Sequence, residues 1–510
     1  MSNLVGTLVS LLRKNVWVLV AFFIPLAIRS VPEVLSWPYP LGMDTVRYIP
    51  IIQSGQVFLS GLLSFVRNHL FYSLATLIYN VVPDAILIIK IFGPLILAFI
   101  SVMMYLYARR GLGWSGFKSF LVALLVATYF VSLRNSWDLY SQSFALIFLL
   151  AALVVFKSSS SPKRYALVFV FMVLTVLSHE LVAVILFFVL GLEAVRFLIK
   201  KLRWDFVFLA VMLGLSGALF LFSHYSQSSG TVVIPIVTTG TDPSAGLSLH
   251  IAGLLVYCYV LILPLVILGF VGLKDWVLRY WVVLCVGIPL LTMLFPTNPL
   301  FYWSRWVYLL VYPLLFFAVH GLDRLWRFWS SYKGKVRRLV PKALAIAYVV
   351  LLLALSGFYL TVSPQNQISY FSASNPYLEY IPSSMLQNAL PVETNPSFVM
   401  CVDWLNTNSV ENSVVVEHYA LYDLVSIYIK NRHVVSVSEG ASGAYNQNET
   451  GIVDGMVGAA RKALDSGSDV VYTVWWISGD GWYKISALPS QFKEVYRSGI
   501  MAVYLFEPAV

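Results

Sequence analysis

The chain has 510 residues, of which 59% are hydrophobic and 11% are charged, and its mean hydropathy is +0.79. This composition excludes an ordinary soluble protein and predicts that most of the chain lies in a lipid bilayer. Its three cysteines, too few for a disulfide scaffold, also have no metal-binding or redox spacing.

The formal net charge of +10 is distributed unevenly along the chain. Up to Val362 there are 27 Lys+Arg and 10 Asp+Glu, a net charge of +17, whereas from Ser363 there are 7 and 14, a net charge of −7. A basic apolar part followed by an acidic polar part argues against nucleic-acid binding and indicates a membrane topology. We therefore expect a membrane domain at residues 1–362 and a soluble domain at residues 363–510.

Eleven apolar stretches in the first part have lengths near those needed to cross a bilayer. They predict a multi-pass α-helical membrane bundle of about eleven transmembrane helices. The predicted spans are 16–28, 85–108, 117–133, 139–156, 165–177, 181–198, 206–222, 251–273, 281–295, 306–320 and 343–362.

Basic residues are concentrated in every second connection between these spans. One set of connections contains 21 Lys and Arg residues, and the opposite set, with the adjoining helix ends, contains six. Short cytoplasmic loops retain Lys and Arg, so the N-terminus is predicted to be cytoplasmic. The acidic C-terminal domain is then extracytoplasmic, and the chain is expected in the cell membrane.

The C-terminal domain alternates between helical and strand patterns, which predicts a small α/β domain after a linker that begins at Ser363. Within it, Asn448-Glu449-Thr450 is a glycosylation sequon on the predicted outer side. The predicted helices are 398–405, 420–430 and 451–463, and the predicted strands are 413–417, 433–436, 470–475, 492–497 and 501–506.

A long external loop between the first two spans holds Asp44, with Arg47 and Tyr48 close behind it. A carboxylate held there can act as a general base or a metal ligand, or it can be a solvated turn residue paired with Arg47. Two apolar pieces that follow, 57–66 and 70–79, are expected to be amphipathic helices at the membrane interface.

Two short outer turns also carry ionisable groups, which are costly near a bilayer and therefore informative. Arg134 and Asp138 lie between the third and fourth spans, where an ion pair that closes a helical hairpin is the alternative to a functional role. His179 and Glu180 lie between the fifth and sixth spans, where helix capping by Ser178 and Glu180 is the alternative.

One arginine, Arg305, lies among aromatic residues at the outer end of the tenth span, next to Tyr302. Arginine suits bidentate phosphate recognition, and an aromatic belt with an interfacial arginine is the other interpretation. Four outer connections thus bring charged groups to one face. Carboxylates opposite an arginine at a bilayer surface suit a lipid-linked phosphate donor.

This plan resembles the GT-C superfamily of integral membrane glycosyltransferases, which includes oligosaccharyltransferase catalytic subunits and protein mannosyltransferases. The residues behind the resemblance are Gly42-Met43-Asp44 with Tyr48, Trp137-Asp138, Ser178-His179-Glu180, and Arg305 with Pro313.

The resemblance implies roles for the same residues. Asp44 would be the catalytic base or a metal ligand, and Arg305 would bind a polyprenyl phosphate. Asp44, Asp138, His179 and Glu180 would form a site for a divalent cation, Mn²⁺ or Mg²⁺. The predicted substrate-binding residues are Arg47, Tyr48, Arg134, Tyr302 and Arg305.

The sequence departs from the family in two places. The first loop has no Asp-x-Asp, which leaves metal dependence open, and Trp475-Trp476 is followed by Ile477 rather than Asp, so oligosaccharyltransferase activity is not assigned. The Ser/Thr/Gly-rich segment 224–250 is similar to the mobile loop that covers the site in such enzymes, and a plain linker is the alternative.

The sequence thus predicts a membrane glycosyltransferase that moves a sugar from a polyprenyl-phosphate carrier in the membrane lipid to a protein, lipid or glycan acceptor on the outer face. Two other classes stay open, a transporter or lipid flippase and a non-catalytic assembly subunit. A transporter is expected to have acids or broken helices near mid-membrane.

Overall fold

The computed structural model describes residues 2–42, 44–55, 70–158, 163–223, 247–295, 303–331, 339, 342–344, 346–352, 354, 390, 392–437, 449–477 and 487–508. Five sequence-based predictions lie outside these residues: the helix at 57–66, Tyr302, most of 224–250, the linker from Ser363 and Asn448.

The chain divides into two compact units. Unit 1 comprises Met1–Val31, Gly55–Pro83 and Lys90–Leu360, and unit 2 comprises Pro32–Ser54, Asp84–Ile89 and Thr361–Val510. The loop that contains Asp44 therefore belongs to the same unit as the C-terminal domain. The predicted domain boundary at residue 362 stays a prediction.

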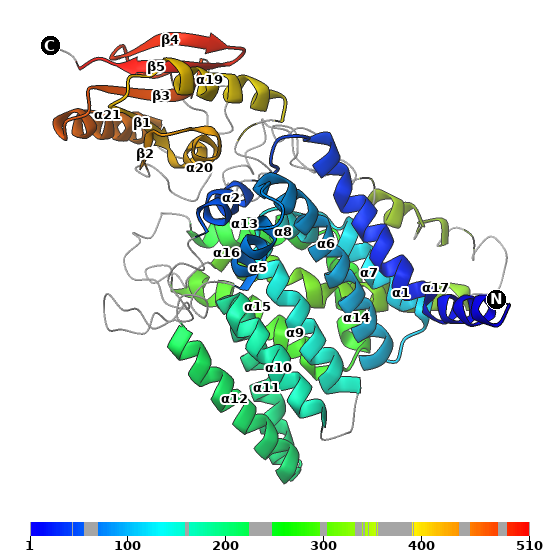
Figure 1. Ribbon diagram of the computed structural model, residues 1–510. Coiled ribbons are helices and arrows are strands. Elements are labelled where there is room, and N and C mark those ends of the chain that lie inside the picture. The colour runs from blue at the N-terminus through cyan, green and yellow to red at the C-terminus, as the bar shows by residue number, and fades with distance from the viewer. Residues whose placement is uncertain are drawn as a thin grey trace. The chain divides into compact units, whose positions relative to one another are not determined.

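Unit 1 is helical, and in Figure 1 helices α9 to α12 lie side by side, each packed on its neighbours. The helices that lie in it wholly or in part are α1 (Ser2–Leu35), α5 (Leu70–Tyr79), α6 (Ala85–Leu106), the π-helix η1 (Tyr107–Gly111), α7 (Gly116–Thr128), α8 (Phe130–Asp138), α9 (Tyr140–Ser158), α10 (Lys163–Ser178), α11 (Glu180–Ile199), α12 (Arg203–Ser223), α13 (Leu247–Tyr259), α14 (Leu263–Gly272), α15 (Trp276–Leu294), α16 (Trp303–Leu309) and α17 (Val311–Ser330).

Among the described residues, seven helices are long and apolar enough to cross a membrane, or nine if each bent helix pair counts as one span. Each of the eleven predicted stretches falls on these or on shorter helices wherever it is described. The multi-pass helical fold is therefore confirmed. The helix expected at 70–79 is α5, and its place at the membrane interface stays a prediction.

Two of the predicted spans are not straight. Helices α7 and α8 are bent by 60° at Tyr129, whose backbone is extended, and α13 and α14 are bent by 81°. The second bend precedes Pro264, which lies in the first turn of α14. Backbone N–H groups in the first turn of a helix have no intrahelical acceptor, so the N–H that proline lacks is not missed there. The first bend has no proline.

Helices α14 and α17 pack unusually closely, because glycines meet backbone atoms of the facing helix. A Cβ atom on Gly269 would lie 1.8 Å from the carbonyl oxygen of Phe317, and one on Gly321 would lie 2.0 Å from that of Leu265. Small residues at such crossings let two backbones approach, which is how membrane helices associate without a hydrophobic driving force.

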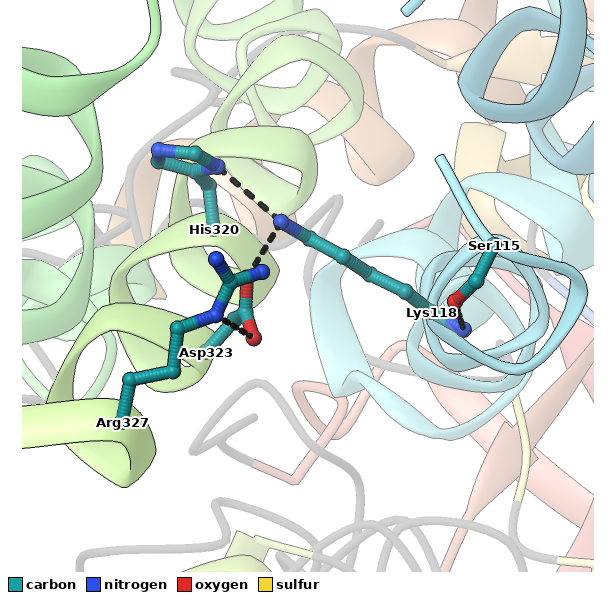
Figure 2. A network of polar contacts seen from close by, with 5 residues as sticks. All are labelled: Ser115, Lys118, His320, Asp323 and Arg327. Atoms are coloured by element: carbon teal, nitrogen blue, oxygen red, sulfur yellow. Dashed lines mark hydrogen bonds and ion pairs between the residues drawn. The ribbon is translucent and has the colours of Figure 1, made fainter. Parts of the chain in front are cut away.

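A polar network joins the start of α7 to the end of α17, and Figure 2 shows its five residues. Lys118 Nζ lies 2.7 Å from Asp323 Oδ2 and 3.1 Å from His320 Nδ1, and Arg327 Nη2 donates to the same carboxylate at 2.8 Å. The Ser115 hydroxyl accepts from the Lys118 backbone N–H and so caps α7. These helix ends lie on the predicted cytoplasmic side.

Unit 2 contains a five-stranded sheet in the order β2-β1-β3-β5-β4 (Figure 1). Strand β1 pairs in parallel with β2 and β3, and β5 pairs antiparallel with both β3 and β4. Helix α19 packs on β3, β4 and β5, α20 on β1 and β2, and α21 on β1, β2 and β3. The predicted α/β domain is confirmed. The strands are β1 (Ser413–His418), β2 (His433–Val437), β3 (Val470–Trp476), β4 (Phe492–Ser498) and β5 (Met501–Phe506), and the helices are α2 (Thr45–Ser54), the 3-10 helix η5 (Val392–Thr394), α19 (Asn395–Asn408), α20 (Tyr419–Tyr428) and α21 (Glu449–Asp465).

A buried carboxyl group lies where β1 and β3 part. Their ladder stops at Val415 and Tyr472, and beyond it Glu417 Oε1 accepts the Val474 backbone N–H at 2.6 Å. Burial raises the pKa of Glu417 well above its usual value, which favours the neutral carboxyl group. Burial lowers the pKa of the neighbouring His418 to about 4.

Candidate active site

Helix α8 is short, and all nine of its residues are buried. It carries Arg134 and Asp138 one turn apart, and the guanidinium group of the first forms an ion pair with the carboxylate of the second. The ion pair that the sequence left as one interpretation is therefore present. Each charge compensates the other in an apolar surrounding.

A second arginine approaches α8 from α1. Arg29 is fully buried, and it donates from Nε to the Ser136 hydroxyl at 3.0 Å and from Nη2 to the Ser136 carbonyl at 3.3 Å. Its guanidinium group also lies 5.5 Å from the ring centroid of Trp137. The sequence placed Arg29 on the predicted outer side, directly after a span that ends at residue 28, whereas α1 continues to Leu35.

Glycine 93 of α6 makes room for this arginine. A Cβ atom at Gly93 would lie 2.5 Å from the Tyr140 hydroxyl and 3.0 Å from Arg29 Nη2, so no larger residue fits there without a shift. Arg29, Arg134, Ser136, Asp138 and Tyr140 are therefore gathered from α1, α8 and α9, and we call them the α8 cluster.

The α8 cluster lies against the helix that carries Arg305. Asn135 Nδ2 donates to the Tyr308 carbonyl at 3.1 Å, which joins α8 to α16. Arg305 is half-buried on α16, one turn before Tyr308. The structure thus packs together the elements that carry two of the four predicted features, whereas Tyr302 lies outside the described residues.

The pair His179 and Glu180 lies at the break between α10 and α11. His179 is the N-cap of α11, and its Nδ1 accepts the Leu181 backbone N–H at 3.2 Å. Capping by Ser178 and Glu180 was the alternative to a functional role, and the Ser178 hydroxyl donates to the Leu174 carbonyl. The imidazole of His179 therefore caps the backbone of α11, with Nδ1 as the acceptor.

In unit 2, Asp44 is half-buried and directly precedes α2, and its carbonyl accepts the Arg47 backbone N–H at 3.1 Å. Tyr48 is buried on the same helix. The Arg47 side chain is exposed, and its Nε lies 3.7 Å from Asp423 Oδ2 on α20.

Asp423 is a partner of this loop that the sequence did not reveal. Burial raises the pKa of its carboxyl group above the usual value, the charge of Arg47 lowers it, and the Asp44 carboxylate raises it further. Both Asp44 and Arg47 are therefore close enough to act on Asp423 electrostatically. No local pattern around residue 423 marks it, because its partners are 376 and 379 residues earlier in the chain.

The predicted cation site draws on both units, since Asp44 belongs to unit 2 and Asp138, His179 and Glu180 belong to unit 1. Within the described residues, no three His, Cys, Asp or Glu side chains form a group that could hold a metal ion. Asp138 is paired with Arg134, and His179 Nδ1 accepts the Leu181 backbone N–H. The four-residue set stays a prediction.

No protein-family model matches the sequence, and no curated protein matches it. Two solved structures are similar to the structure of this chain: an oligosaccharyltransferase of Archaeoglobus fulgidus in complex with Zn and sulfate, and the arabinofuranosyltransferase AftD from mycobacteria. The first is 11% identical with a TM-score of 0.48, and the match covers 89% of this chain and 67% of that one. The second is 12% identical with a TM-score of 0.46, and the match covers 97% of this chain but only 40% of that one.

Both neighbours are membrane glycosyltransferases of the GT-C superfamily, the group that the sequence resembles. At this level of identity the activity of the chain is inferred from its own residues.

Proposed function

We propose that this chain is a membrane glycosyltransferase that takes a sugar from a polyprenyl-phosphate donor and transfers it to a hydroxyl group of a protein, lipid or glycan acceptor. The observation that carries the proposal is the α8 cluster, in which Arg29 and Arg134 are buried in a strongly apolar chain. Ionisable groups kept inside a membrane bundle at such cost mark functional sites.

The cluster supports phosphate binding through its guanidinium groups. Arginine presents a planar fork of donors that matches phosphate oxygens, and its charge persists at any physiological pH. Arg305 lies on α16, which packs on α8, and so adds a third guanidinium group from an adjoining element. In the proposed reaction these arginines hold the donor phosphate and stabilise it as the leaving group.

Asp44 is the proposed general base, with Arg47 and Tyr48 as binding residues beside it. Its carboxylate takes the proton from the acceptor hydroxyl while that oxygen attacks the anomeric carbon of the sugar. The bond between the anomeric carbon and the phosphate oxygen breaks, and the polyprenyl phosphate leaves with the electron pair. The outer face is the proposed side of transfer, with the N-terminus in the cytoplasm and residues 363–510 outside.

The part played by a divalent cation is tested separately, because the residues named for it are divided between the two units. No step above passes through a metal. A chelator should leave transfer unchanged, and activity restored by Mn²⁺ or Mg²⁺ after chelation would return Asp44, Asp138 and Glu180 to a ligand role.

A lipid flippase or transporter is the second candidate, and the two bent helix pairs favour it. Broken helices line substrate paths in transporters, and α7–α8 and α13–α14 are bent by 60° and 81°. The α8 cluster adjoins the first of these bends, so its charges suit a path as well as a site.

One experiment separates the two candidates. The purified protein is placed in proteoliposomes with a labelled polyprenyl-phosphate sugar, and transfer to acceptors and movement of the lipid are measured together. Asp44→Asn should lower transfer by about a hundredfold or more, because a general base contributes about 10²–10⁴-fold.

The matched control is Asp84→Asn, an exposed acid that accepts the Leu87 backbone N–H and whose amide can do the same. Equal transfer by Asp44→Asn and the control would remove Asp44 from the mechanism. Lipid movement without transfer would favour the flippase.

A further inference from the structure

The loop that carries Asp44 is docked on the C-terminal domain. Helix α2 begins at the residue after Asp44 and packs on α20 of the sheet domain, and both lie in unit 2. Both helices also bury apolar side chains. The buried apolar residues are Val46, Tyr48, Ile49 and Ile52 on α2, and Leu421, Leu424 and Val425 on α20.

The ion pair at the edge of this contact is asymmetric. The Asp423 side chain is 22% exposed, whereas the Arg47 side chain is 68% exposed, and Arg47 Nε lies 3.7 Å from Asp423 Oδ2. Asp423 is therefore the fixed partner, and Arg47 keeps most of its guanidinium surface in solvent. An arginine has five N–H donors, so contact through Nε is compatible with a second anion at the remaining donors.

We propose that Asp423 is a positioning residue of the transfer reaction, which holds Arg47 so that its guanidinium group meets the donor phosphate beside Asp44. The inference rests on the proposed function and extends it, because it makes the C-terminal domain a part of the site. Asp423 does not itself touch the reacting atoms. It acts through Arg47, whose remaining donors are those that a phosphate needs.

Steady-state kinetics with a labelled polyprenyl-phosphate sugar test this role. Asp423→Asn should raise the donor KM about three- to fivefold with kcat unchanged, the effect expected of a partly exposed ion pair. Arg47→Ala should raise KM at least as much, and the double variant should be no worse than Arg47→Ala. Asp423→Glu, which keeps the carboxylate, should have the same donor KM as the wild type.

The matched control is Asp403→Asn, an exposed carboxylate on α19 of the same domain. A donor KM for Asp423→Asn equal to that of the control would overturn the proposal, and so would additive losses in the double variant. A purely structural role would lower kcat and raise KM together, and Asp423→Glu would then restore neither.

A measurement that needs no activity separates failure of this inference from failure of the proposed function. Hydrogen exchange at the α2 amides should become faster in Asp423→Lys, which repels Arg47, than in Asp403→Lys. Equal exchange in the two variants would overturn the contact itself. No transfer by the wild type with any donor would overturn the proposed function and, with it, the role of Asp423.

Discussion

Replacing Gly269 by alanine tests the close crossing of α14 and α17. The added Cβ atom would lie 1.8 Å from the Phe317 carbonyl oxygen and 2.6 Å from its carbonyl carbon. Heavy atoms in contact are separated by about 3.5 Å, so the two backbones must move apart by roughly 1.7 Å. Both colliding atoms belong to a helix backbone, which a side-chain rotation cannot relieve.

The cost of Gly269→Ala should therefore reach the upper end of the range for overpacking, about 3 kcal/mol. The measurement is thermal unfolding of the detergent-purified protein, and we expect a fall in the midpoint on the order of 5 °C. The control is Gly214→Ala in α12, where an added Cβ meets nothing within 4 Å and alanine favours the helix. Equal midpoints for the two variants would refute the packing argument.

Three further predictions concern other parts of the chain. Arg134→Ala should destabilise the protein by about 3–5 kcal/mol in the same unfolding assay, because it leaves Asp138 buried without its charge partner. The double variant Arg134→Leu/Asp138→Leu should recover most of that stability but should not recover transfer activity. An undiminished midpoint for Arg134→Ala would contradict the buried pair. The raised pKa of Glu417 means that the folded protein holds this proton more tightly than the unfolded one, so its contribution to stability is full below pH 4.5 and is lost as the pH rises towards the folded-state pKa. Glu417→Gln, which keeps the acceptor for Val474, should then raise the unfolding midpoint at pH 7 and flatten its pH dependence, and a lower midpoint would argue against a neutral carboxyl group. In intact cells a membrane-impermeant maleimide should label Glu411→Cys on the C-terminal domain but not Lys200→Cys at the end of α11, and the reverse pattern would invert the predicted topology.

The C-terminal domain shows how much the sequence could predict. The strand expected at 501–506 is β5 with the same bounds, and the other predicted strands lie within two residues of the observed ones. These strands are short apolar runs between turn residues, a local signal that survives in any tertiary context. The helical stretches of unit 1 were found for the same reason.

The bends and the site were harder to predict. The stretch 117–133 is largely apolar and has no proline or glycine to mark the break at Tyr129, whereas Pro264 lies directly after the second bend. The buried position of Arg29 was not predicted, because hydropathy alone ended the first span at residue 28, whereas α1 continues to Leu35. Asp423 has no local signal at all, since its importance comes from a partner in another part of the fold.

The docking of α2 on α20 also has a consequence for biosynthesis. Arg47 is made 376 residues before Asp423, and at about 5–20 residues per second roughly 20 to 75 s pass between them. During that time the Asp44 loop is already translocated, under the predicted topology, without the surface on which it rests. A nascent or truncated chain that ends before α20 should therefore carry this loop undocked, and under the proposed mechanism transfer would begin only after the C-terminal domain has folded.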